Sequence, residues 1–352
     1  MEKTKPAVRR RATALPRGTR LSVQNGQLLV STGVPSVDQA IGGGLAVGTV
    51  LLIEEDAHSS YSEILLRYFF AEGVVSGHGA YVASGAVKST GVELIETLPA
   101  LCSDTEKSQE SKDDMKIAWR YRDLPEMKQS ASAQFGHSFD LSRCMDSKEV
   151  EKTSVDIFDC NPHHRCDHLI DSLSACIDKG KYGTAISSVE KRNVLRIGIH
   201  SLGSPLWSDM TNKISILRFL YRLRGLVRSS YAVALVTIPT HLFRDEAFVR
   251  RVEHLSDVAI HLESFEGSEK EKNPVYKDYH GLFHICRLSR LNSLACHLPE
   301  TTSLAFKLHR KKFAIEKLYL PPDASETASR SKGSGSGNCG SGTHAGKAAL
   351  EF

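Results

Sequence analysis

Residues 31–66 decide the fold, and they read STGVPSVDQAIGGGLAVGTVLLIEEDAHSSYSEILL. Within this stretch Val50–Ile53 is a short apolar run of β-branched and Leu residues, which predicts a buried strand. A polar loop follows it. Four apolar residues then recur at the spacing of one helix face, namely Ile64, Leu65, Tyr68 and Phe69. The stretch therefore predicts a strand, a loop and a helix in succession.

The rest of the chain continues this alternation. We expect further strands at 80–83, 116–121, 194–200, 231–238, 258–262, 280–288 and 303–318. A helix is expected over 214–227, with residues 214, 217, 220, 223 and 227 facing inward. Strands that alternate with helices and end in a run of strands predict an α/β fold: a mostly parallel twisted sheet, flanked by helices, with antiparallel strands at its C-terminal edge.

Composition suggests how the chain is divided. We expect one domain over residues 21–322, with polar insertions near 103–116 and 128–152. Residues 1–20 form a basic, disordered tail with seven Lys/Arg against one Glu, and residues 323–352 form a disordered tail rich in Gly and Ser. The basic tail fits a solvated arm, a nucleic-acid contact or a nuclear address, and it weakly resembles a mitochondrial transit peptide.

Global composition excludes several classes of protein. The chain has 352 residues, 41% of them hydrophobic, and a net charge of +4, which rules out wholly disordered, collagen-like and coiled-coil proteins. No apolar run approaches the roughly 20 residues of a membrane span, and no apolar block follows the basic N-terminus. The eight cysteines are scattered. We therefore expect a soluble intracellular protein with reduced thiols and no membrane partner.

The segment from Ser31 to Ile53 resembles the start of RecA-type ATPases of the KaiC and RadA kind. In those enzymes the same order of a Thr-Gly-hydrophobic-Pro segment and a Gly-Gly-Gly-Leu turn leads into the strand before the phosphate loop. Here the loop departs from its Gly-x-x-x-x-Gly-Lys-Ser/Thr pattern. Glu55 stands at the first Gly, Ser60 at the second and Tyr61 at the Lys, so that only Ser62 matches.

Charge makes this loop unfavourable for ATP. Glu54, Glu55 and Asp56 place three carboxylates where a polyphosphate would bind, and like charges repel at such distances. The second ATPase signature also departs, because His200 replaces the Asp that positions Mg²⁺, and imidazole is a poor substitute for that ligand. We expect no cofactor. The acidic loop either packs against a neighbouring segment or forms an unrelated anion or metal site.

Three stretches resemble a narrower family. They are residues 21–84, the segment RIGIHSLGSPLW at 196–207, and residues 306–322. Together they are similar to the PAXNEB family, the fourth subunit of the Elongator complex, over roughly residues 20–323. The Ser-Leu-Gly-Ser-Pro-Leu-Trp run is the most distinctive part, because it places a Pro and a Trp directly after a buried strand.

This resemblance implies a RecA-like fold and a place in a hetero-hexameric ring with Elongator subunits five and six. It also implies attachment to the catalytic Elongator subcomplex, tRNA binding in support of carbon-5 modification of the wobble uridine (U34), and a cytoplasmic and nuclear location. With degenerate ATPase motifs, the chain is expected to be an accessory subunit and not an enzyme. An active ATPase whose non-standard pocket is completed by a neighbouring subunit is the alternative; DNA recombination is disfavoured because it needs ATP.

Basic residues near the C-terminal strands are candidates for tRNA phosphate contacts, and they are Arg287, Arg290, Lys307, Arg310, Lys311 and Lys312. A strand edge protected by charge is the plainer interpretation. Four arginines of the 214–227 helix region, at 218, 222, 224 and 228, could face a ring neighbour. A cluster at Cys160, His163, His164, Cys166 and His168 suggests zinc, but it lacks Cys-x₂-Cys spacing, which favours a loop.

Overall fold

The computed structural model describes residues 15–57, 60–85, 90–102, 135–160, 166–185, 192–207, 212–292, 301–309 and 311–318. These residues belong to one compact unit that ends at Leu318. The insertion expected near 103–116 and the strand expected at 116–121 lie outside the described residues, as do residues 1–14 of the expected N-terminal tail and all of the expected C-terminal tail, 323–352. No helix in the described ranges is both long enough and apolar enough to cross a bilayer.

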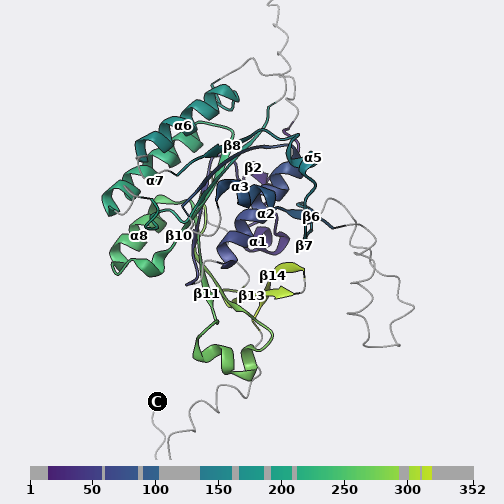
Figure 1. Ribbon diagram of the computed structural model, residues 1–352, viewed down its shortest axis with the longest axis vertical. Coiled ribbons are helices and arrows are strands. Elements are labelled where there is room, and N and C mark those ends of the chain that lie inside the picture. Colours follow the sequence, from purple (N-terminus) through teal and green to yellow (C-terminus); the bar gives the residue numbers. More distant parts are fainter. Residues whose placement is uncertain are drawn as a thin grey trace, which may run out of the picture. The chain divides into compact units, whose positions relative to one another are not determined.

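A nine-stranded sheet forms the centre of the described fold (Figure 1). Its order is β14-β13-β12-β11-β4-β10-β9-β5-β8. The strands are β4 (Val50–Glu54), β5 (Gly79–Ser84), β8 (Val155–Phe158), β9 (Leu195–His200), β10 (Ala232–Ile238), β11 (Val258–Ser264), β12 (Gly281–Arg287), β13 (Leu304–His309) and β14 (Lys312–Lys317). Pairing is parallel from β11 to β8 and antiparallel from β11 to β14, which confirms the predicted architecture.

Helices cover both faces of this sheet (Figure 1). One face carries α1 (Pro35–Ala40), α2 (Ser60–Ser76), α3 (Gly91–Glu96) and α5 (Ser147–Val150), and the other carries α6 (Cys166–Lys179), α7 (Lys213–Arg228) and α8 (Glu246–Leu255). Each face has its own apolar cluster. Because β4 is covered on both sides, all five of its residues are buried, as its continuous apolar sequence predicts.

Shorter elements complete the fold. A small sheet joins β1 (Thr19–Leu21), β2 (Leu28–Val30) and β3 (Leu45–Ala46), and a second pairs β6 (Pro99–Leu101) with β7 (Phe139–Cys144). Single 3-10 turns occur at η2 (Thr240–Leu242), η3 (Glu269–Lys272) and η4 (Pro274–Tyr276). Part of the stretch expected as a polar insertion, 128–152, therefore forms β7 and α5, and Phe139 of β7 is buried.

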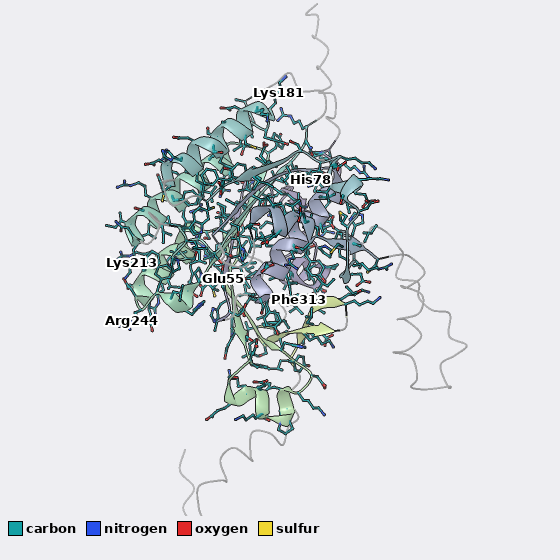
Figure 2. The ribbon with its side chains drawn as sticks, viewed as in Figure 1. Glu55, His78, Lys181, Lys213, Arg244 and Phe313 are labelled. Carbon is teal, nitrogen blue, oxygen red and sulfur yellow. The ribbon has the colours of Figure 1, made fainter. Side chains whose placement is uncertain are left out.

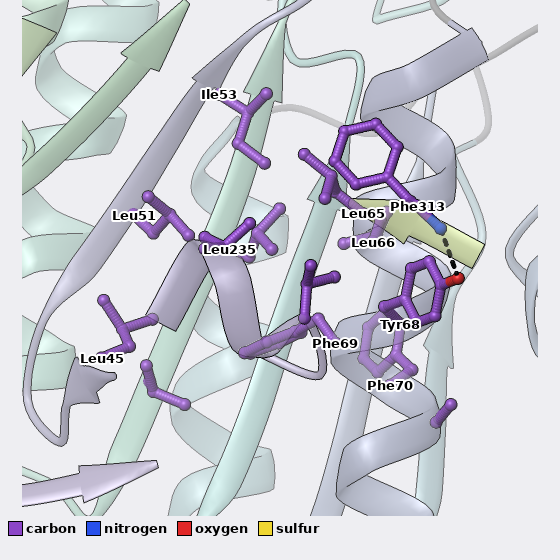
Figure 3. Packing of buried hydrophobic residues seen from close by; sticks show 14 of the residues in the cluster. Leu45, Leu51, Ile53, Leu65, Leu66, Tyr68, Phe69, Phe70, Leu235 and Phe313 are labelled. Carbon is purple, nitrogen blue, oxygen red and sulfur yellow. Dashed lines mark hydrogen bonds between the residues drawn. The ribbon is translucent and has the colours of Figure 1, made fainter. Parts of the chain in front are cut away.

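The α2 helix is buried on nearly every side. Figure 3 shows Leu65, Phe69 and Phe70 of this helix packed beside the apolar side chains of the sheet. At its outer side the backbone N–H of Phe313 in β14 donates to the Tyr68 hydroxyl at 3.1 Å (Figure 3). This contact ties the C-terminal hairpin to the helix that follows the first central strand.

The predicted inward face of α7 was partly wrong. Leu220, Leu223 and Val227 are buried as expected, but Ile214 is 65% exposed, while Ile216 and Phe219 are buried in its place. Packing of α7 against α6 and α8 selects these positions, because the helix lies between two neighbours and buries a wider stripe than a single sheet contact requires.

A fully buried arginine on β9 connects the sheet to α2 and to the segment at Ser31. Arg196 of β9 donates through Nη1 to the backbone carbonyls of Ser31 and Phe69, both at 2.9 Å, and through Nε to Nδ1 of His78 at 3.1 Å. A buried guanidinium is tolerated only with such partners. Gly73 of α2 leaves room for it, since a Cβ at Gly73 would lie 2.7 Å from Cδ of Arg196.

Replacing Gly73 with Ala is therefore expected to destabilise the protein by about 1–2 kcal/mol, although Ala is the better helix former. The pinned Arg196 cannot move away from the new methyl group. Gly225 of α7 provides the matched control: a Cβ there meets nothing within 4 Å, so Gly225→Ala should stabilise by about 0.5–1 kcal/mol. Urea denaturation of both variants measures the difference, and equal effects at the two positions would contradict this account.

Candidate functional site

The candidate site lies where β4, β10 and β9 end side by side. These strands are parallel neighbours, so their carboxyl ends meet at one edge of the sheet, which is where open α/β sheets bind ligands. Figure 2 shows Glu55 at this edge, near the middle of the molecule. Glu54, Glu55 and Asp56 are all buried, at 5%, 2% and 2% exposure.

Glu55 is held by hydroxyl groups from the two adjacent strand ends. The Oγ of Ser201, which follows β9, donates to its carboxylate oxygens at 2.9 and 3.2 Å, and Oγ1 of Thr237 in β10 donates to Oε1 at 2.5 Å. The backbone N–H of Ser201 in turn donates to Thr237 Oγ1 at 2.8 Å. The carboxylate at the first glycine position of the phosphate loop is thus part of a buried network of internal hydrogen bonds.

Asp56 occupies the space at the N-terminal end of α2. Its Oδ1 accepts a hydrogen bond from the backbone N–H of Tyr61 at 3.3 Å. In phosphate loops the N–H groups at this helix end bind the phosphate oxygens, since the helix dipole favours an anion there. Here the chain supplies its own carboxylate to that helix end, and an incoming phosphate would meet a negative charge.

Tyr61 does not occupy a phosphate site as the lysine would. Its ring packs against Phe306 at 4.7 Å and Phe313 at 6.4 Å between centroids, and it meets His280 edge-on at 6.3 Å. Burial of the ring raises the pKa of its hydroxyl. The ring is therefore an anchor between α2 and the antiparallel strands.

The other two loop positions are part of α2. Ser60 begins the helix and is exposed. Ser62, the residue that matches the Ser/Thr of the phosphate-loop pattern, is fully buried. The structure thus brings together the predicted positions 55, 60, 61 and 62 at one strand-to-helix junction. It gives each of them a contact within the fold or a helical position, which supports the packing interpretation of the loop.

His200 lies at the end of β9, beside Ser84 at the end of β5. Its Nδ1 is 3.3 Å from the Ser84 hydroxyl, and its buried Nε2 has no hydrogen-bond partner in the described part of the chain. Burial lowers the pKa of this imidazole and favours its neutral form. A neutral ring with one hydroxyl partner has no means of replacing the Mg²⁺-positioning carboxylate.

A pocket of about 470 Å³ opens at the same end of β4, on the side of α8, and Glu54, Glu55 and Asp56 all contribute to its wall; we call it the α8 pocket. Glu54 and His261 line it, with His261 Nδ1 3.1 Å from Glu54 Oε2, and this contact raises the pKa of His261. Glu253 of α8 also lines it. Burial, together with the Glu54 carboxylate, raises the pKa of Glu253 to about 7.

The basic residues proposed for RNA contact do not form one surface. Lys307, Lys311 and Lys312 lie near the β13–β14 turn, where Lys307 pairs with Glu316 at 2.7 Å and Lys311 with Asp140 at 3.2 Å. We call these three lysines the hairpin cluster. Arg310 lies outside the described residues.

Arg287 and Arg290 lie near the other end of these strands. Gly281 of β12 is opposite Phe306, and Arg287 is six residues farther along, or ~20 Å at the usual rise of a strand. The Nη1 of Arg287 donates to the carbonyl of His254 at 2.5 Å and thereby caps α8. Arg290 is exposed. The six candidates thus divide into two separate groups.

Helix α7 uses two of its arginines internally. Arg224 and Arg228 both donate to the buried Asp257, at 2.9 and 2.8 Å, and Arg222 pairs with Asp167.

The loop expected at 160–168 is partly helical, because Cys166 and His168 lie in the first turn of α6. Residues 161–165 are outside the described ranges.

The chain matches one protein family over most of its length. A profile described as PAXNEB protein matches residues 12–352. The chain belongs to the PAXNEB family. Similar curated proteins named Elongator complex protein 4 include one from Xenopus laevis, 45% identical over 93% of this chain and 88% of that protein, and one from Homo sapiens, 45% identical over 89% and 82%. A Drosophila melanogaster relative of the same name is 32% identical over 92% and 94%.

The sequence of this PAXNEB chain indicated the strand-to-helix junction at Glu55, but it did not indicate which residues bind the Glu55 carboxylate there. Ser201 and Thr237 lie 146 and 182 residues from Glu55. Thr237 carries no motif signal, and Ser201 begins the Ser-Leu-Gly-Ser-Pro-Leu-Trp run, which indicated a family but no contact with Glu55. The available clue was the end of each buried strand, because parallel strands bring such residues together once their order in the sheet is known.

Tyr61→Lys, which restores the lysine of the phosphate-loop pattern, is expected to lower the free energy of unfolding by about 2 kcal/mol. It removes a half-buried ring from Phe306 and places an ammonium group against apolar side chains. Tyr61→Phe keeps the ring and should change stability by less than about 0.5 kcal/mol. Thermal and urea denaturation compare the two. A Tyr61→Lys chain as stable as Tyr61→Phe would mean that the ring does not anchor α2.

Proposed function

We propose that this chain is a non-catalytic RecA-like subunit of the Elongator complex. The proposal begins from curated relatives that bear the name Elongator complex protein 4 and align with about nine-tenths of the chain at up to 45% identity. Identity at this level over most of both chains supports the same place in the same assembly. The contacts at the end of β4 then suggest what kind of subunit it is.

One observation carries the non-catalytic part of the proposal. Glu55, at the first glycine position of the phosphate loop, is buried and bonded to Ser201 and Thr237. To admit a triphosphate, this carboxylate would have to leave its two donors, and the phosphate would replace it beside Asp56. Both steps are unfavourable, since each leaves buried polar groups unpaired or brings like charges together.

A place in a hetero-hexameric ring with Elongator subunits five and six extends the proposal. Its structural support is an apolar stripe on the outer face of α7. Ile214 and Tyr221 are 65% and 71% exposed and are separated by two helical turns, so they lie on the same face. Exposed large apolar side chains at this spacing suit packing against a neighbouring subunit.

The proposed role of the ring is to bind tRNA and support carbon-5 modification of the wobble uridine by the catalytic Elongator subcomplex, in the cytoplasm and nucleus. RNA affinity would come from lysines and arginines that face phosphates. The hairpin cluster is the preferred candidate, because Lys311 remains 48% exposed while paired with Asp140. Arg287 is a weaker candidate, since it caps α8.

We expect the full chain alone to show no saturable ATP binding at millimolar nucleotide, because the loop offers carboxylates where phosphates would bind. Isothermal titration with Mg-ATP measures this, and inorganic phosphate and ADP serve as further titrants. Saturable ATP binding that Tyr61→Ala abolishes would contradict the proposal and support an active ATPase with a non-standard pocket.

The second experiment mixes the full chain with Elongator subunits five and six. Native mass measurement is expected to give a hetero-hexamer that binds tRNA. In that assembly Lys311→Gln with Lys312→Gln should weaken tRNA binding several-fold. The slope of log affinity against log salt should fall by roughly 0.7–0.9 for each phosphate that the variant no longer neutralises.

Lys179→Gln with Lys181→Gln is the matched control, since it removes the same charge far from the hairpin; Figure 2 shows Lys181 at the top of the ribbon, well separated from Phe313. This pair should leave tRNA affinity unchanged. Equal decreases in affinity for both pairs would mean that the hairpin cluster has no special role. A chain that stays monomeric beside both partners would contradict the ring itself.

A further inference from the structure

A mixed group of metal-ligating side chains forms where Glu54 and Glu253 of the α8 pocket come close to Cys286, and none of the three takes part in the hydrogen bonds that hold Glu55. Glu54 is the last residue of β4, Glu253 lies on α8 and Cys286 lies on β12. Each offers one ligand atom, and these three atoms lie within 4.8 Å of one another. Three elements that are distant in sequence thus converge on one point, and one of them supplies a thiol.

The carboxylate of Glu54 gives an independent indication of a cation. Its Oε2 is engaged by His261 Nδ1 at 3.1 Å and by the Thr240 hydroxyl at 3.4 Å. Its Oε1 is fully buried and has no hydrogen-bond donor among the described residues. The Glu54 side chain is only 6% exposed. An unsatisfied buried carboxylate oxygen costs about 1–3 kcal/mol; a proton on Glu253 compensates for it in the metal-free chain, and a bound ion would do so once Glu253 is ionised.

A bulge in β12 accounts for the position of Cys286. Ala259 of β11 is opposite Arg287, whereas the next residue, Ile260, is opposite Ile285. Cys286 is therefore the extra residue, with no partner across the strand pair. Bulges of this kind redirect a side chain locally, and here the residue is exposed to solvent while its thiol lies near Glu54 and Glu253.

We propose that Glu54, Glu253 and Cys286 bind a zinc ion, with water from the α8 pocket as the fourth ligand. Zinc accepts thiolate and carboxylate ligands at about 2.3 and 2.0–2.2 Å, so tetrahedral binding places the ligand atoms roughly 3.5 Å apart. The observed spread permits this after a small contraction. Mg²⁺ and Ca²⁺ are disfavoured because they select oxygen ligands and not sulfur.

The surroundings of the three ligands suit this assignment. His261 donates to Glu54 from outside the ligand group and orients the carboxylate, as the hydrogen-bond partners of ligating carboxylates do. Glu246 and Glu263 also line the pocket, but they pair with Arg250 at 3.6 Å and Lys270 at 2.5 Å, so the charge that would attract a cation comes from Glu54 and Glu253. Binding would release the thiol proton of Cys286 to solvent and fasten α8 to the two strands.

The test uses the full chain after treatment with a chelator. Titration with Co²⁺, which replaces zinc in such sites and reports sulfur ligation by a thiolate-to-metal absorption band, should saturate at one equivalent and be displaced by Zn²⁺. Cys286→Ser should abolish the band, Glu253→Gln should weaken Zn²⁺ binding, and His261→Ala should weaken it roughly 10–100-fold. Circular dichroism and the melting temperature verify that each variant is folded.

Two controls make the result decisive. Cys144→Ser removes another exposed thiol and should keep the band. Cys160→Ser with Cys166→Ser removes both thiols of the other cysteine-histidine cluster in the sequence and should also keep it. A band that survives Cys286→Ser, that disappears in the Cys160/Cys166 variant, or that never saturates would overturn the proposed site.

Discussion

The hydrogen bonds between Glu55 and the hydroxyls of Ser201 and Thr237 are the constraint on which the proposed function depends. They connect the ends of β4, β9 and β10, three adjacent strands of the sheet. A carboxylate placed there is stable only because both hydroxyls donate to it, and the hydroxyls are satisfied only while it remains. The same junction that suits a triphosphate in an ATPase is therefore closed by internal hydrogen bonds.

Neighbouring acids at the end of β4 have different environments. Glu55 lies within the hydroxyl network, and Asp56 accepts from the start of α2. Glu54 contacts His261 on the α8 side and keeps one buried oxygen without a donor among the described residues. Successive residues of a strand point to opposite faces, so one short acidic run serves both layers of the fold.

Much of the charge that the sequence displays is used inside the fold. Arg196 joins β9 to α2 and to the Ser31 segment, Arg224 and Arg228 hold Asp257, and Arg287 caps α8. Paired or capping arginines of this kind stabilise the fold and contribute little to an external surface. Under the proposed function, the surfaces left for partners are the hairpin cluster, whose Lys311 stays 48% exposed in its pair with Asp140, and the apolar stripe on α7. This distribution suits a subunit that works through contacts with other molecules.

The sequence by itself determined the α/β architecture, the central strand at 50–53, the antiparallel C-terminal edge and the departure from the phosphate-loop pattern. Those features depend on local periodicity and on residue chemistry at known spacing. It did not locate β8 or α8, and it misplaced the inward face of α7, because their burial depends on neighbours distant in sequence. Only the tertiary structure joined Glu55 to Ser201 and Thr237, separated Arg287 from the hairpin cluster, and brought Cys286 to Glu54. Strand order and one bulge produce those contacts, and neither can be predicted from the local spacing of residues along the chain.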